Sequence, residues 1–314
     1  MYYFIVSAAS AGGKGMKVWH EVRLALEKTT IKYRSFRTRH KGHATELAKR
    51  ISAIDDPDMN IIVLGGDGTI NEVINGITDF EKVKLGVVPV GSGNDFCRGL
   101  GIKGSSAEIL GGILEKSNKG EYTAVDLGMV STEEFGDRLF AISSGFGLDA
   151  IVCKTVDGSR AKKVLNALRL GKFAYGIQTV FSLFSMDTFR AGGESDMETR
   201  LYNGVIFAAV MNMRAEGGGV PMAPDADPFD GHLSVCCAHD IAKWKTFLYL
   251  PRLLAAKHES IEGFDIFETY RLNMVLNKPV VLHTDGEYVG EVARLEYECL
   301  PGRLRLLNNL PEMA

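Results

Sequence analysis

The stretch Ile61-Ile62-Val63-Leu64-Gly65-Gly66-Asp67-Gly68-Thr69-Ile70-Asn71-Glu72-Val73-Ile74 joins a buried strand to a helix through a glycine loop. Four apolar residues open it, three of them β-branched, and apolar residues recur at helical spacing from Ile70 to Ile77. Glycines have no Cβ atom, so backbone N–H groups can approach a phosphate closely, and the positive N-terminal end of the helix points at the same place. The stretch therefore predicts a phosphate-binding loop.

Asp67 adds a second constraint on this loop. Polyphosphate repels a carboxylate unless a cation lies between them or the carboxylate moves a proton, so Asp67 suggests a Mg²⁺ site or acid/base chemistry. The loop is neither a Walker A motif, because no Gly-Lys-Ser/Thr follows, nor a Gly-x-Gly-x-x-Gly fingerprint. A plain turn between strand and helix is the alternative, since Asp and Gly are common turn residues. The buried strand before the loop, and Thr69, Asn71 and Glu72 after it, favour nucleotide binding.

Length and composition narrow the class of protein. A chain of 314 residues exceeds the usual size of one domain, so we expect two. With 46% hydrophobic and 24% charged residues, the composition is that of an ordinary globular protein, and the net charge of -3 gives no general reason to expect nucleic acid as a partner. Its five cysteines form an odd set without Cys-x-x-Cys spacing, which argues against disulfides and zinc and predicts reduced thiols in a cytosolic protein.

Membrane insertion is not expected. Residues 1–6 are apolar but no basic segment precedes them, so they predict a first strand instead of a signal peptide. The best candidate for a span, residues 247–256, is interrupted by Pro251 and Arg252 and falls short of the roughly 18 apolar residues that a span needs. We therefore expect membrane contact to be peripheral only.

Strands and helices alternate in the first part of the chain. Strands are expected at residues 2–6, 31–38, 61–64 and 84–90, and helices at residues 16–30, 42–54 and 70–77. This alternation predicts a doubly wound parallel sheet with helices on both faces, in which ligands bind beyond the carboxyl ends of the strands. The loops at residues 7–15, 38–42, 65–69 and 91–95 all fall at that edge.

Short strands separated by turns follow from about residue 121, which predicts an antiparallel β-sandwich with a helical insertion at residues 160–184. The expected strands span residues 122–130, 139–144, 205–211, 233–238, 271–276, 280–284 and 294–298. We place an α/β domain at residues 1–125 and a β-sandwich domain at residues 126–299, and allow residues from about 300 to 314 to return to the first domain.

Five motifs follow one another along nearly the whole chain. They are Gly65-Gly66-Asp67-Gly68-Thr69-x-Asn71-Glu72, Pro89-x-Gly91-Ser92-Gly93-Asn94-Asp95-Phe96, Asp126-x-Gly128, Pro224-x-Ala226-x-x-x-Asp230-Gly231-x-Leu233 and Asp285-Gly286-Glu287. In this ordered set the chain resembles the diacylglycerol kinase catalytic-domain family, in particular its soluble bacterial lipid kinases, which are relatives of sphingosine and ceramide kinases. The resemblance implies an ATP-binding domain similar to those of NAD kinases and phosphofructokinases, followed by a β-sandwich.

The resemblance also assigns residues to ATP and Mg²⁺. It implies ATP contacts at Thr38, Gly65, Gly66, Asp67, Gly68, Thr69, Ile70, Asn71, Ser92 and Asn94. It further implies that Asp67, Asp95 and Asp126 organise catalytic Mg²⁺, partly through water. From the residues alone, Asp95 could instead cap a helix that begins at Phe96.

Catalysis is assigned by resemblance to the last motif, with Asp285, Glu287 and Asp67 as the catalytic set. Glu287 matches the family's proposed general base, which takes the proton of the lipid hydroxyl as it attacks the γ-phosphate. The choice between Glu287 and Asp67 as the base stays open. Without the resemblance, Asp285-Gly286 between apolar runs predicts a type I′ hairpin turn.

A second metal site is implied at Asp227, Asp230 and the backbone carbonyl of His232, where oxygen ligands suit a hard ion such as Mg²⁺ or Ca²⁺. An Asp-Gly turn is the alternative there. The chain departs from the family at Ser7-Ala8, where Asn-Pro is usual, which leaves the geometry after the first strand open.

Two segments, residues 160–173 and 243–257, interleave basic with apolar side chains. Either could lie on an anionic membrane surface, and the favoured alternative for both is an amphipathic helix packed on the sandwich.

The function that these features predict is an ATP- and Mg²⁺-dependent lipid kinase, peripheral to the cytoplasmic face of the membrane. Diacylglycerol is the leading acceptor by resemblance, with a sphingoid base or another lipid alcohol behind it, and a homodimer is left open. The alternatives are an NAD kinase-like enzyme, which shares the Gly65 to Gly68 loop, and a nucleotide- or lipid-binding regulator without turnover.

Overall fold

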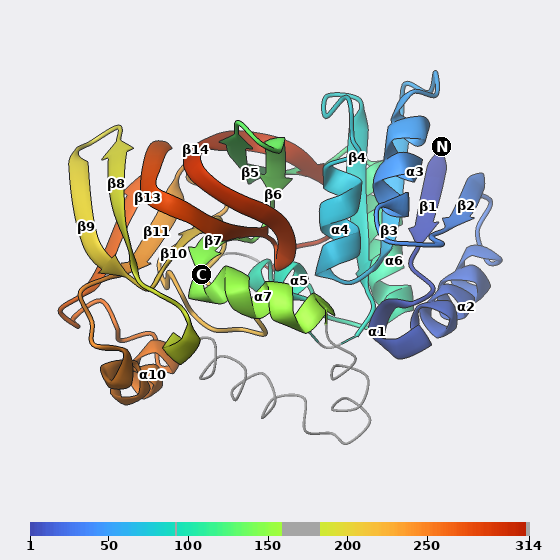
Figure 1. Ribbon diagram of the computed structural model, residues 1–314. Helices are drawn as coiled ribbons and strands as arrows, with labels where there is room; N and C mark the ends of the chain where they lie inside the picture. Colours follow the sequence, from blue (N-terminus) through green and yellow to red (C-terminus); the bar gives the residue numbers. More distant parts are fainter. Residues whose placement is uncertain (92, 159–182, 312–314) are drawn as a thin grey trace. The chain divides into compact units, whose positions relative to one another are not determined.

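The structure is a computed structural model that describes residues 1–91, 93–158 and 183–311 (Figure 1). The chain divides into two compact units. Unit 1 comprises Met1–Leu127 and Pro301–Ala314, and unit 2 comprises Gly128–Leu300.

Unit 1 contains a parallel sheet with its strands in the order β4, β3, β1, β2. These strands are β1 (Tyr2–Val6), β2 (Tyr33–Arg37), β3 (Met59–Gly65) and β4 (Val83–Pro89). Arg305 and Leu306, at the end of β14 (Glu287–Leu306), extend the sheet beside β4 in parallel. Every residue of β1 and β3 is buried, as expected for parallel strands that are covered on both faces.

Helices cover both faces of this sheet. They are α1 (Ser10–Gly13), α2 (Gly15–Leu26), α3 (His43–Ser52), α4 (Asp67–Ile74), α5 (Asp95–Gly99) and α6 (Ser106–Asn118). The pair α3 and α4 packs together on one face, and the pair α2 and α6 on the other (Figure 1). Because the four strands run parallel to one another, the predicted loops that follow them lie at one edge of the sheet.

Unit 2 is built from antiparallel strands. They are β5 (Thr123–Thr132), which begins in unit 1, β6 (Gly136–Phe140), β7 (Ser143–Gly147), β8 (Phe189–Ser195), β9 (Thr199–Val205), β10 (Phe207–Met211), β11 (Leu233–Ala238), β12 (Phe264–Thr269), β13 (Arg271–Thr284) and β14. Strands β12, β11, β10, β7 and β13 pair in that order, and β13 pairs with β8 as well. Among its described residues, unit 2 includes the helix α7 (Leu148–Gly158), the 3₁₀ turn η1 (Lys243–Lys245) and the helix α10 (Thr246–Leu254).

Strand β13 pairs with β14, with a register shift between Val275 and Val280, and it also pairs with two other strands. Its first half pairs with β8 over Leu272–Leu276, and its last residues, Leu282–Thr284, pair with β7. The buried side chains of these strands form the apolar core of unit 2. The last residues of β13 lead directly into the Asp285 turn.

The predicted fold class, a parallel α/β sheet followed by a β-sandwich, is confirmed. Several boundaries were wrong. The strand expected at residues 139–144 is interrupted after Phe140, and the strand expected at residues 205–211 is two strands that meet at Ile206. Strands β8 and β12, most of β9, and helices α6 and α7 were not predicted. The helical insertion lies outside the described residues apart from its last two. All five cysteines are free thiols.

Candidate active site

The first glycine loop lies between β3 and α4. A Cβ atom on Gly65 would lie 2.6 Å from Cβ of Thr69, so the strand can meet the helix only through a glycine at this position. Gly66 is the extended residue before the helix, and its carbonyl accepts the amides of Thr69 and Ile70 at 3.0 and 3.1 Å. Nothing lies within 4 Å of a Cβ placed on Gly66, so this side of the loop is open to a ligand.

Asp67 connects this loop to the second glycine motif. Its carboxylate accepts the backbone N–H of Asp95 at 2.9 Å and that of Phe96 at 3.1 Å. A carboxylate at the first amides of a helix is stabilised by hydrogen bonds and by the helix dipole. Asp67 therefore holds the start of α5 against the loop that follows β3.

Asn94 completes the connection from the other side. Its Oδ1 accepts the amide of Cys97 at 2.8 Å, which makes Asn94 the N-cap of α5, and its Nδ2 donates to the carbonyl of Gly65 at 3.4 Å. The alternative that Asp95 caps this helix is wrong, because the cap lies one residue earlier. The buried carboxylate of Asp95 instead pairs with Arg98.

The remaining predicted residues of unit 1 are Thr38, Asp126 and Ser92. Thr38 directly follows β2 and is half-buried, and its amide donates to the carbonyl of Val6 at 2.9 Å. Asp126, which is 3% exposed, lies in β5 and accepts the amide of Gly302 at 2.5 Å. Ser92 lies outside the described residues.

Glu72 has a role that its place in the motif did not reveal. Its two carboxylate oxygens accept the amides of Gly42 and Ala44 at 2.7 and 3.0 Å. These amides belong to the start of α3, which otherwise begins without a side-chain cap. The glycine motif therefore also fixes the neighbouring helix on the same face of the sheet.

Asp67, Asp95 and Asp126 provide carboxylate oxygens, the ligand type that Mg²⁺ prefers. Among the described residues, however, these three do not form a group with all its donor atoms within 4.8 Å. A Mg²⁺ ion held by these carboxylates would need further oxygen ligands, such as phosphate or water.

The last motif is a tight turn between β13 and β14. Asp285 and Gly286 both have left-handed backbone conformations, with φ of 48° and 79°, as a two-residue type I′ hairpin requires. The buried carboxylate of Asp285 accepts the amides of Ala141, Ile142 and Ser143 at 3.0, 2.8 and 3.0 Å. Asp285 therefore anchors the turn, and Glu287 begins the next strand.

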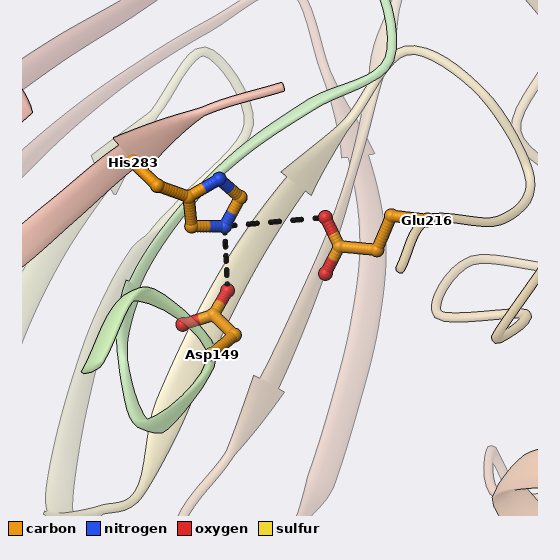
Figure 2. Close-up of side chains that lie close together, drawn as sticks. All are labelled: Asp149, Glu216 and His283. Carbon is orange, nitrogen blue, oxygen red and sulfur yellow. Dashed lines mark hydrogen bonds and ion pairs between the residues drawn. The ribbon is translucent and has the colours of Figure 1, made fainter. Parts of the chain in front are cut away.

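His283, which lies two residues before Asp285, forms a cluster with Asp149 and Glu216 (Figure 2). This cluster was not predicted. Nε2 of His283 lies 3.0 Å from Oδ2 of Asp149 and 4.0 Å from Oε2 of Glu216. The other ring nitrogen, Nδ1, accepts the amide of Gly286 at 3.2 Å. The imidazole therefore connects the two carboxylates to the backbone of the turn.

Burial and neighbouring charges shift the pKa values of His283 and Glu216 in opposite directions. Burial by itself lowers the pKa of His283, but the facing carboxylates of Asp149 and Glu216 outweigh it and raise this pKa to about 9. Burial raises the pKa of Glu216, although the charge of His283 opposes the shift. The Gly286 amide needs a lone pair on Nδ1, so it favours the neutral ring and competes with the carboxylates, which favour the cation.

Gly145 on β7 makes room for the cluster. A Cβ atom there would lie 2.0 Å from Oδ2 of Asp149 and 2.8 Å from Nε2 of His283. The only local signal in the sequence was the position of His283 two residues before Asp285, because Asp149 and Glu216 are distant in the chain.

The residues assigned to a second metal lie in the loop between β10 and β11. Oδ1 of Asp227 accepts the amide of Phe229 at 3.1 Å, and Oδ1 of Asp230 accepts the amide of His232 at 2.8 Å. Nδ1 of His232 lies 3.0 Å from the carbonyl of Asp230. These are the hydrogen bonds of Asp turns, and they leave carboxylate oxygens for a hard cation.

Known proteins are similar to this chain over nearly its whole length. Residues 1–130 match the diacylglycerol kinase catalytic domain, and residues 142–308 match the YegS C-terminal NAD kinase beta sandwich-like domain. A Bacillus subtilis protein named "Putative lipid kinase YtlR" is 30% identical over 292 residues, covering 92% of this chain and 94% of that protein. A Bacillus subtilis "Diacylglycerol kinase" is 29% identical over 251 residues, covering 79% and 77%.

The fold is also found in a solved structure. The crystal structure titled "a putative diacylglycerol kinase from Bacillus anthracis" is 22% identical, with a TM-score of 0.76 over 98% of this chain and 95% of that one. This likeness shows a common fold, and the sequence matches show the relationship. The chain belongs to the diacylglycerol kinase catalytic-domain family and is a lipid kinase homologue.

Proposed function

We propose that the protein transfers the γ-phosphoryl group of ATP to a lipid hydroxyl in a Mg²⁺-dependent reaction, with diacylglycerol as the leading acceptor. The observation that carries the proposal is the junction of the two glycine motifs, in which Asp67 holds the first amides of α5 beside the open side of Gly66. Phosphoryl transfer depends mainly on positioning and charge stabilisation, and such a junction holds the two glycine motifs in a fixed arrangement. Relatives named diacylglycerol kinase support the choice of acceptor.

In this proposal the loop from Gly65 to Asn71, together with Thr38 and Ser92, binds the phosphates of ATP, and Asn94 shapes the loop. Bound Mg²⁺ would neutralise charge on the β- and γ-phosphates. Asp67, Asp95 and Asp126 would hold it, partly through water. Asp67 would do so while its carboxylate also accepts two backbone amides.

Glu287 is the proposed base. Its carboxylate takes the proton of the lipid hydroxyl, the hydroxyl oxygen bonds to the γ-phosphorus, and the bond from that phosphorus to the bridging oxygen breaks to release ADP. Asp285 acts as a positioning residue, because its carboxylate is held by three amides. Asp67 is the less suitable base because both of its oxygens already accept amides.

The test is transfer of labelled phosphate from ATP to diacylglycerol in mixed micelles, with Mg²⁺ and without it. Glu287→Gln and Asp67→Asn are compared with the wild type, and ATP binding is measured separately. We expect turnover only with Mg²⁺ and a loss of at least about 100-fold in Glu287→Gln, the lower end of the usual contribution of a general base. If all three proteins bind ATP but show the same negligible rate, the protein is a regulator without turnover and the proposed kinase function is wrong. Phosphorylation of NAD in place of lipid would favour the NAD kinase alternative.

The proposed acceptor defines a location. A diacylglycerol-type lipid lies in the bilayer and ATP is cytoplasmic, so the reaction would take place at the inner face of the membrane. We propose peripheral attachment there, without nucleic acid as a partner.

A further inference from the structure

Helix α10 and the preceding turn η1 expose apolar side chains on the surface of unit 2. On the inner side of the helix, Tyr249 and Leu253 pack against the apolar core. On the outer side, the large apolar residues are between 47% and 63% exposed: Trp244, Leu248, Leu250 and Leu254. The helix is therefore apolar on both sides, and packing on the sandwich accounts for only one of them.

The same segment carries charge of a single sign. Residues 243–257 contain Lys243, Lys245, Arg252 and Lys257 and no acidic residue. Lys245, Arg252 and Lys257 are exposed, and Nζ of Lys245 lies 6.0 Å from the centre of the Trp244 ring. Exposed leucines and a tryptophan among lysine and arginine match the interface of an anionic bilayer, where aliphatic groups enter the acyl region and basic groups meet the head groups.

Both ends of the segment are fixed to unit 2. The ammonium group of Lys243 donates to the carbonyl of Met186. After the helix, His258 is fully buried, and its Nε2 lies 2.9 Å from the carbonyl of Met222. The segment that carries the exposed side chains is therefore fixed to unit 2 at both ends.

The geometry limits how a membrane could be engaged. Helix α10 has nine residues, and a span requires roughly 20. No helix of the described residues is long and apolar enough to cross a bilayer. A helix of this length can only lie in the plane of the interface.

We infer that the outer face of η1–α10, formed by Trp244, Lys245, Leu248, Leu250, Arg252 and Leu254, docks on the surface of an anionic lipid bilayer. This inference rests on the proposed function, since a bilayer is where the proposed acceptor lies, but vesicle binding measures it without turnover. The docked face would place unit 2, which carries the Asp285 turn, at the membrane.

The experiment is co-sedimentation with vesicles of phosphatidylcholine alone or with phosphatidylglycerol added. The double variant Leu248→Ser/Leu254→Ser removes the apolar contact, and Lys245→Gln/Arg252→Gln removes charge. Leu201→Ser is the matched control, because Leu201 is 82% exposed on β9, outside this face. We expect wild type and control to bind the anionic vesicles alike, and thermal unfolding to show that every variant folds.

The expected losses are about tenfold or more in the partition coefficient for the leucine pair. Each basic side chain removed should cost about fivefold, and added salt should weaken wild-type binding in the same direction. The turnover ratio of vesicle-embedded diacylglycerol to a short-chain monomeric acceptor should fall in both double variants. If the protein binds vesicles but phosphorylates neither acceptor, the proposed function is wrong, whereas the docking surface is still supported.

Two results would overturn the docking surface. One is wild-type binding to anionic vesicles that the leucine pair does not reduce. The other is a wild-type dimer, seen by light scattering, that Leu248→Ser/Leu254→Ser dissociates, because a second copy of the chain would then cover this face.

Discussion

Nε2 of His283 lies 3.0 Å from Oδ2 of Asp149, and the same ring accepts the amide of Gly286 through Nδ1. The ring therefore links α7 to the turn that precedes Glu287. Glu216 faces it from the loop after β10, and Asp285 adds a further negative charge from the turn itself. The protonation state of one buried imidazole should thus be visible in the stability of the protein.

We predict that the free energy of unfolding falls as the pH rises from about 6.5 to about 9. The folded-state pKa of His283 is raised from 6.5 to about 9, so its contribution is complete below 6.5 and is lost as the pH passes through about 9. The loss should be on the order of 3 kcal/mol at most. Urea unfolding at several pH values measures it.

Asp149→Asn is the control for this pH dependence. Without the carboxylate that lies nearest to Nε2, the pKa of His283 should fall and the slope between pH 6.5 and 9 should flatten. An unchanged slope would show that another group titrates. Nitrogen chemical shifts of His283 would show in addition whether Nδ1 gains a proton and releases the Gly286 amide.

Substitution of Asp285 should mainly lower stability, and substitution of Glu287 should mainly lower turnover. In Asp285→Asn the side-chain NH₂ cannot accept an amide, so at least one of the three hydrogen bonds to residues 141–143 is lost, and we expect a cost of about 2–4 kcal/mol. Glu287→Gln keeps the shape of the side chain and should change stability by less than about 1 kcal/mol, while it lowers the rate of transfer by at least about 100-fold. Thermal unfolding and the lipid kinase assay are run on both variants. If Glu287→Gln is the less stable of the two, the assignment of stability to Asp285 and turnover to Glu287 is wrong.

The parallel sheet could be predicted because its strands are buried on both faces and therefore appear as continuous apolar runs, as in β3. The two interrupted strands could not. The break after Phe140 occurs where the Asp285 carboxylate takes the amides of residues 141–143, a contact about 140 residues away in the chain. The break at Ile206 follows Gly204, whose φ of 55° lies at the register shift between β9 and β8.

In the candidate site, too, the local motifs could be predicted from the sequence and their long-range partners could not. The glycine loops and Asp285-Gly286-Glu287 are contiguous motifs, and the sequence alone indicated their positions at strand ends and in a hairpin. The partners of Asp67 and the cluster around His283 depend on which loops the sheets bring together, and a local pattern does not contain that information. Asn94 was assigned to ATP, and its hydrogen bonds show that it also caps α5.

Adjacent glycines of the first loop should respond differently to alanine. In Gly65→Ala the new Cβ would meet Thr69 at 2.6 Å, so we expect a loss of about 1–3 kcal/mol in stability. In Gly66→Ala the methyl group enters open space and the backbone φ of -99° suits alanine, so stability should stay within about 0.5 kcal/mol. ATP affinity should nevertheless fall, because the methyl group occupies the proposed approach of the phosphates. Calorimetric titration with ATP that finds no change in Gly66→Ala would place the phosphates elsewhere.

The cap of α5 provides a test of the junction between the two motifs. Asn94→Ala removes the acceptor of the Cys97 amide and the donor to the Gly65 carbonyl, so we expect a loss of about 1–2 kcal/mol in stability, together with weaker ATP binding. Asn94→Asp is the matched control, because it keeps the acceptor for Cys97 and loses only the donor to Gly65. If the junction positions the ATP loop, Asn94→Asp should retain most of the stability and still bind ATP more weakly than the wild type. ATP affinity equal to that of the wild type in both variants would show that α5 is fixed by Asp67 alone, and urea unfolding beside ATP titration would distinguish the two cases.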